Sequence, residues 1–159
     1  MGQRIRLRDC VLTISSVGAT VTVKLGDGTA KWNTTRQMQY DLNRGVIDTV
    51  HEGDDVPMDL EINASWEYVR SSSGEAISPV EAVSKTGAAA GWVSTGELWE
   101  PYAVNVTIVF TPAYGATAGR IETYFFPDFR CEKSAFTLEN ANIVLSGRCN
   151  ATVPTITRS

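Results

Sequence analysis

The chain has 159 residues, with 14 Lys and Arg against 18 Asp and Glu, which gives a formal net charge of −4. This length favours one domain spanning residues 1–159, and the acidic balance argues against a protein that grips nucleic acid by neutralising phosphates. Hydrophobic residues at 43% and charged residues at 20% are typical of a soluble globular protein, which argues against disorder and against a fibrous repeat.

The amino-terminal part is predicted to form short strands. Their residue patterns predict strands over residues 4–8, 11–14 and 20–25, and Gly26-Asp27-Gly28 is expected to be a turn. The basic start of the chain is not followed by an apolar run of signal-peptide length, and the longest apolar runs are strand-like. We therefore expect no membrane insertion by this chain.

Two longer strands are predicted next, over residues 35–50 and 56–68, with Gly45 as a bulge or bend in the first. In the second, apolar and polar residues alternate strictly. The apolar set is Val56, Met58, Leu60, Ile62, Ala64, Trp66 and Tyr68, and the polar set includes Asp59, Glu61, Asn63, Ser65 and Glu67. Turn residues at 52–55 separate the two strands, which predicts an antiparallel hairpin with one face on a core and the other in water.

Residues 71–99 are predicted to be a long loop that contains one short helix. Ser78 can cap this helix, Pro79 occupies its first position and Glu81 completes a capping box, so the helix is expected over residues 78–85. The rest of the loop is rich in small residues and contains two tryptophans. Exposed aromatic residues in such loops mark protein contacts, so we expect an inter-subunit contact here. Its candidate residues are Gly87, Gly91, Trp92 and Trp99.

The last part of the chain is predicted to contain strands over residues 103–110, 120–126 and 141–149. Residues 150–159 contain Pro154 and show no turn back, so they are expected to form a carboxy-terminal arm that could dock on another surface.

No catalytic or metal site is predicted. The chain has a single histidine and no GxSxG nucleophile elbow, which argues against an acyl-transfer enzyme, and no cofactor is expected. His51 beside Glu52, Asp54 and Asp55 fits a solvated acidic turn better than a cation site, because most sites draw ligands from a second element. Asp59 and Glu61 could stand about 7 Å apart on one strand, but a solvated polar face is the usual meaning of such a row.

The three cysteines are Cys10, Cys131 and Cys149. Their odd number and wide spacing fit neither a disulfide framework nor a CxxC motif. Free thiols are the simplest expectation.

Several stretches resemble the tail tube (major tail) proteins of long-tailed bacteriophages, in the same order along the chain. They are packing and turn motifs rather than catalytic signatures. The stretches are residues 41–50, Glu52-Gly53-Asp54, the strand through Trp66-Glu67-Tyr68, residues 100–104, Phe126-Pro127-Asp128-Phe129 and Leu145-Ser146-Gly147.

The resemblance implies a mainly β subunit, an antiparallel β-sandwich or β-barrel with one short flanking α-helix. Six copies would form a ring, and the rings would stack into a hollow tube in the virion tail, assembled in the cytoplasm of the host bacterium. The implied partners are further copies of the chain, a tape-measure protein and DNA in the lumen, a tail terminator protein, distal tail or baseplate proteins, and a sheath if the tail contracts.

The hairpin supports this expectation independently. Repeated around a ring, an amphipathic hairpin could close edge to edge into a large inter-subunit barrel with a polar inner wall. Asp59, Glu61, Asn63, Ser65 and Glu67 are then the candidate lumen-facing residues. Such an acidic wall would repel phosphate within a Debye length of about 8 to 10 Å, so that DNA slides during genome ejection.

Three other readings stay open. A ring protein of a contractile injection or type VI secretion tube would share the architecture and pass a different cargo. A carbohydrate-binding β-sandwich would need a row of exposed tryptophans on one sheet. A jelly-roll or lipocalin-type enzyme or carrier would need a buried polar pocket.

Overall fold

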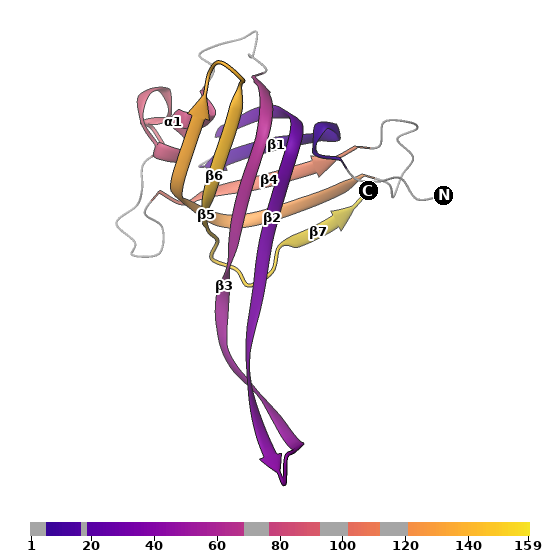
Figure 1. The fold of residues 1–159 in the computed structure, drawn as a ribbon. Helices are drawn as coiled ribbons and strands as arrows, with labels where there is room; N and C mark the ends of the chain where they lie inside the picture. The colour runs from indigo at the N-terminus through magenta and orange to yellow at the C-terminus, as the bar shows by residue number, and fades with distance from the viewer. Residues whose placement is uncertain (1–5, 17–18, 69–76, 93–101, 112–120) are drawn as a thin grey trace.

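The computed structural model describes residues 6–16, 19–68, 77–92, 102–111 and 121–159. Within these ranges the chain is mainly β, with one antiparallel sheet of seven strands and one short α-helix (Figure 1). The strands are β1 (Cys10–Ser16), β2 (Ala19–Asn43), β3 (Val46–Tyr68), β4 (Val104–Phe110), β5 (Glu122–Thr137), β6 (Asn142–Arg148) and β7 (Thr155–Arg158). The helix α1 spans Pro79–Ser84, and two 3-10 helices, η1 and η2, span Leu7–Asp9 and Gly87–Ala89. The predicted mainly β, antiparallel fold with one short helix is confirmed.

The sheet runs in the order β4-β1-β2-β3-β6-β5-β7, and β4 also pairs with β5. This extra pairing joins two distant parts of the sheet, so the hydrogen-bonded path through β4, β1, β2, β3, β6 and β5 returns to its start. The inner side chains of these strands therefore share one hydrophobic core. α1 lies beside them, and its Ala82 and Val83 belong to that core.

Strict alternation explains which side chains fill the core. β1 and β4 both alternate between buried and half-buried residues along their whole length. The largest fully buried side chains include Leu12, Ile14, Leu25, Met58, Leu60, Ile62, Phe126, Phe129, Ile143 and Leu145. One face of each strand thus packs inward, as a sheet with one solvated face requires.

The hairpin is present, but its turn lies elsewhere than predicted. β2 and β3 are joined by Arg44 and Gly45, which have φ values of 52° and 82°. Two consecutive positive φ values define the two-residue type I′ turn that matches the twist of antiparallel strands. The prediction of a turn at residues 52–55 is wrong, because these residues lie inside β3. Gly45 is a turn residue rather than a bulge.

The predicted turn at Gly26-Asp27-Gly28 is also wrong. β2 continues through these residues, and the pairing with β3 shifts register between Leu25 and Gly28, which is a β-bulge. A Cβ atom on Gly28 would lie 2.2 Å from the carbonyl oxygen of Asn63. Glycine here reflects close approach of two backbones within the sheet, and this explains how a turn-like triplet can sit in a strand.

The remaining elements follow the sequence in most places. The predicted strands 11–14, 103–110, 120–126 and 141–149 correspond to β1, β4, the first part of β5, and β6. The strand predicted over residues 4–8 is wrong where it is described, because residues 7–9 form η1; residues 4 and 5 lie outside the described ranges. The helix is confirmed with its capping box, in which the Val80 amide donates to Ser78 Oγ (3.3 Å) and the Ser78 amide to Glu81 Oε2 (3.1 Å).

The carboxy-terminal stretch ends in a strand of its own. β7 pairs antiparallel with the first residues of β5, from Phe125 opposite Thr155 to Glu122 opposite Arg158. All four residues of β7 are exposed. The stretch that the sequence suggests as an arm is therefore docked at least in part on its own chain.

Candidate assembly surfaces

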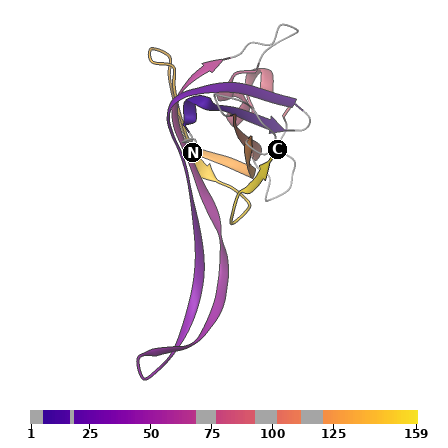
Figure 2. The same ribbon diagram turned by 90° about the vertical axis from the view of Figure 1, so that its right-hand side faces the viewer.

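The outer part of the β2–β3 hairpin leaves the body of the molecule. β1 pairs with β2 only as far as Lys24, and β6 pairs with β3 only from Asp59 to Ser65. Beyond these points, no other described strand lies along either strand of the hairpin. Figures 1 and 2 show this outer part projecting far from the sheet, and we call it the arm (residues 34–57). Two long strand edges with backbone N–H and C=O groups are thus left without a partner strand among the described residues.

One face of the arm is apolar although it is exposed. Tyr40 lies opposite Val50, and Leu42 lies opposite Ile47, so each pair shares a face. The exposed fractions of these residues and their neighbour are Met38 42%, Tyr40 55%, Leu42 64%, Ile47 56% and Val50 52%. A continuous exposed row of large apolar side chains marks a contact surface, in contrast to the scattered single residues that any protein surface shows.

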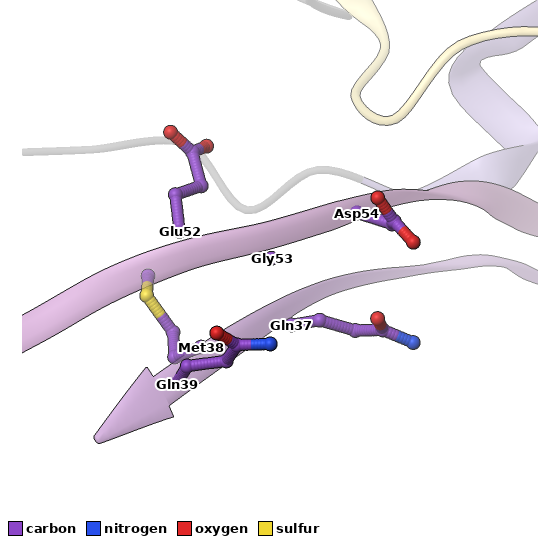
Figure 3. Close-up of a pocket in the computed structure, with 6 residues that line it drawn as sticks. All are labelled: Gln37, Met38, Gln39, Glu52, Gly53 and Asp54. Carbon is purple, nitrogen blue, oxygen red and sulfur yellow. The ribbon is translucent and has the colours of Figure 1, made fainter. Parts of the chain in front are cut away.

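An acidic group extends this apolar row toward the body. Glu52 lies opposite Met38 in the register, and Figure 3 shows both side chains directed to the same side of the ribbon. Here the register shifts again, so that Gly53 and Asp54 face the single residue Gln37. The bulge leaves an open groove lined by Gln37, Met38, Gln39, Glu52, Gly53 and Asp54 (Figure 3). Such bulges twist a ribbon and blunt its edges against indiscriminate pairing.

The opposite face of the arm carries a polar cluster. Asp41 Oδ2 accepts a hydrogen bond from Thr49 Oγ1 at 2.9 Å and lies 2.9 Å from His51 Nε2. These contacts connect β2 to β3 near the tip and hold the register of the turn. His51 therefore engages the neighbouring strand instead of the carboxylates that follow it in sequence. Within the described ranges no group of three or more His, Cys, Asp or Glu side chains could hold a metal ion.

The candidate lumen-facing row lies where the alternation places it. Asp59, Glu61, Asn63 and Glu67 are exposed and Ser65 is half-buried. The residues between them, Met58, Leu60, Ile62 and Ala64, are at most 1% exposed. The predicted division of this strand into a core face and a water face is confirmed, and the lumen assignment stays a prediction.

Neighbouring strands place cations beside that acidic row. Glu61 lies opposite Lys31 and Glu67 lies opposite Lys24 on β2. On the β6 side, Arg148 Nε lies 3.2 Å from Asp59 Oδ1 and 4.0 Å from Glu132 Oε1. The face is therefore balanced in charge. An expectation of a purely acidic wall came from reading one strand alone, without its neighbours.

The loop residues proposed for inter-subunit contact are divided. Trp92 is only 4% exposed and belongs to the core, so the expectation that it is exposed is wrong. The segment of α1 and η2 folds inward and buries Ala82, Val83 and Ala89 together with it. Gly91 is exposed, whereas Gly87 has a φ of 56° and an added Cβ would lie 2.6 Å from Glu81 Oε1. Trp99 lies outside the described residues.

A small polar network fastens β7 to the body. Arg158 Nε donates to Glu122 Oε1 at 3.0 Å, and the Tyr124 hydroxyl donates to Glu122 Oε2. These two hydrogen bonds lower the pKa of Glu122. Burial, together with the bond to Glu122, raises the pKa of Tyr124 to about 12. The edge of β5 is thus closed by a strand that depends on one ion pair.

The three cysteines are free thiols in this structure. Burial raises the pKa of Cys10 to about 11 and that of Cys149 to about 12, and it also raises the pKa of Cys131. A thiol acts as a nucleophile or a metal ligand as the thiolate. At neutral pH all three are therefore in the unreactive, protonated form.

Comparison with known proteins adds no relative. None of the known protein-family models matches the sequence, and no curated protein matches it. Of the helices that the structure describes, none has the length and apolar character to cross a membrane. The surfaces described above are therefore the basis for a functional conclusion.

Proposed function

We propose that the chain is the structural subunit of a bacteriophage tail tube, which assembles into stacked rings, with six copies in each, and forms a conduit for genome delivery. The observation that carries this proposal is the arm, a long two-stranded ribbon with an exposed apolar face and no partner strand among the described residues. Such a surface is a liability for a monomer and an asset for a subunit. No enzymatic activity is part of the proposal.

The arm supplies a driving force for association. Fully burying a large apolar side chain contributes roughly 1.5–3 kcal/mol. The row of Met38, Tyr40, Leu42, Ile47 and Val50 is about half exposed in the single chain. A contact that covers the whole row would therefore contribute several kcal/mol for each copy, in addition to any hydrogen bonds made by the strand edges.

The body suits repetition in a closed assembly. Its six-strand path is already closed, so further copies meet the arm and the surface of the body in preference to opening the core. The arm of one copy and the surface that it meets on the next are different patches, and such heterologous contacts generate rings or filaments. A tube of stacked rings combines both.

The balanced face of β3 suits the wall of a conduit for DNA. Tight phosphate binding needs cations that are free to replace the counterions of the nucleic acid. Arg148 is already held by Asp59 and Glu132, and Lys31 lies opposite Glu61. In the proposed tube, Asp59, Glu61, Asn63, Ser65 and Glu67 line the lumen, and DNA slides because no cation on this face lacks a neighbouring carboxylate.

The proposed partners follow from a tail. They are other copies of the chain, a tape-measure protein and DNA in the lumen, and terminator and distal tail or baseplate proteins at the ends, with a sheath if the tail contracts. A ring protein of a contractile injection system would use the same arm, and gene neighbours separate the two. A carbohydrate-binding module fits less well, because Trp92 is buried and Trp32 and Trp66 are partly buried against the core.

Negative-stain microscopy and sedimentation of the purified chain test the proposal. We expect rings or tubes for the wild type. The double variant Leu42→Glu/Ile47→Glu places two charges on the apolar face and should lower the sedimentable fraction at least about tenfold, since desolvating a carboxylate in an apolar contact is unfavourable.

The matched control is Gln39→Glu/Asn43→Glu, which adds the same charge at exposed positions that alternate with the apolar row. It should still assemble, and circular dichroism should show both variants folded. A wild-type chain that remains monomeric at high concentration would refute the proposed function.

A further inference from the structure

A second surface lies at the other end of the same hairpin. Residues Lys24, Leu25 and Gly26 of β2 and Ser65, Trp66 and Glu67 of β3, together with Arg8 of η1, line a groove of about 300 Å³. The register places Lys24 opposite Glu67 and Leu25 opposite Trp66, far along the ribbon from the Arg44–Gly45 turn. In Figures 1 and 2 the end of β3 and the tip of the arm lie at opposite ends of the molecule.

The groove combines an apolar floor with cations at its rim. Leu25 is 1% exposed and belongs to the core, and Trp66 packs against that core. Arg8 and Lys24 are exposed, and neither makes an ion pair in the structure as described. With Glu67 the lining carries a net charge of +1, so the groove favours an apolar group flanked by acidic ones.

The arm has the complementary chemistry. Its residues 34–57 hold two arginines and five carboxylates, a net charge of −3 within a chain whose total is −4. Asp41 is engaged by Thr49 and His51. The other carboxylates form no ion pair with any described residue, and they are Asp48, Glu52, Asp54 and Asp55. Glu52 shares a face with the apolar row, and Asp48 interrupts the register beside Ile47.

We propose that the groove lined by Arg8, Lys24, Leu25 and Trp66 receives the arm tip of a second copy of this chain. Apolar side chains of the tip, with Leu42 and Ile47 foremost, cover Leu25 and Trp66, while Asp48 and Glu52 approach Arg8 and Lys24. At about 300 Å³ the groove holds the tip and not the whole arm.

This inference rests on the proposed function and adds its direction. Because donor and acceptor lie at opposite ends of one ribbon, each copy can bind one neighbour through its tip and another through its groove. Repetition of such a head-to-tail contact propagates along an axis, as required for stacking one ring on the next. The charged part of the contact should weaken as salt shortens the Debye length from about 10 Å at 0.1 M to about 3 Å at 1 M.

A charge-exchange experiment with mixed variants tests the pairing. The tip variant is Asp48→Lys/Glu52→Lys, and the groove variant is Arg8→Glu/Lys24→Glu. Each variant alone should lose at least about tenfold of its sedimentable assembly, because like charges then meet at every contact. An equimolar mixture should assemble again, since the basic tip fits the acidic groove and the two unchanged surfaces fit each other in an alternating stack.

Lys133→Glu reverses an exposed lysine on β5 outside the groove and should assemble as the wild type does. Restored assembly in the mixture shows that both variants are folded and supports the pairing. If the wild type assembles but the mixture does not, or if either variant assembles alone, the groove is not the acceptor and the proposed function stands. If the wild type does not assemble, the proposed function itself fails.

Discussion

The two halves of the β2–β3 hairpin share one pattern and have opposite surroundings. In the inner half, Leu60, Ile62 and Ala64 alternate with polar residues and are at most 1% exposed. In the arm, Tyr40, Leu42 and Val50 also occupy one face, and each is more than 50% exposed. Alternation therefore encodes an amphipathic ribbon, while burial depends on whether another element of the chain reaches the apolar face. The inner half finds that element within its own chain.

The largest test of this comparison uses two leucines of the same hairpin. Leu60→Ala should destabilise the fold by about 2–5 kcal/mol, because it removes packing from a fully buried site. Leu42→Ala should change the free energy of unfolding by no more than about 0.5 kcal/mol, because the residue is 64% exposed. Urea unfolding of the monomeric chain at low concentration measures both. Equal losses would mean that the arm is packed in the monomer.

A second test addresses the bulge in the inner half of the hairpin, toward its body end. Gly28→Ala should cost about 1–3 kcal/mol, because the new Cβ would lie 2.2 Å from the Asn63 carbonyl oxygen and 2.5 Å from Ala64 Cα. Gly91→Ala is the control, since no atom lies within 4 Å of a Cβ at that position. Thermal melts compare the two variants. A Gly28 variant as stable as the Gly91 variant would contradict the close approach of the strands.

The smallest effect is expected at β7, which is exposed like the arm but has a partner strand. Because the pKa of Glu122 is lowered in the folded chain, its ionised form stabilises the fold above its unfolded pKa of about 4.3, and this contribution is lost as pH falls through the folded value. Arg158→Gln should therefore destabilise the chain by no more than about 1 kcal/mol at pH 7 and have little effect once Glu122 is protonated.

Melting temperatures of wild type and Arg158→Gln between pH 7 and pH 3 measure this difference. The Ser159 amide donates to the Ile121 carbonyl at 3.0 Å, so its hydrogen exchange reports opening of β7 directly. A deficit that persists unchanged in acid would show that Arg158 acts through something other than the Glu122 carboxylate.

The position of the hairpin turn shows where local reasoning failed. Two clusters offered turn chemistry, Arg44-Gly45 and residues 52–55, and the second has more acidic and glycine residues. Only the first adopts consecutive positive φ values, and the second is absorbed as a bulge opposite Gln37. The choice depends on pairing over the full length of both strands, which no short window contains. Trp92 failed for a related reason, since its burial depends on where α1 and η2 pack.

The sequence by itself determined the β class, the water face and core face of β3, and the capping box of α1, because alternation and capping depend on residues only a few positions apart. Tertiary structure decided which half of the hairpin is buried, which cations balance Asp59, Glu61 and Glu67, and that β7 closes the edge of β5. These features join residues far apart in the chain. They therefore follow from the register and closure of the whole sheet and from no single strand.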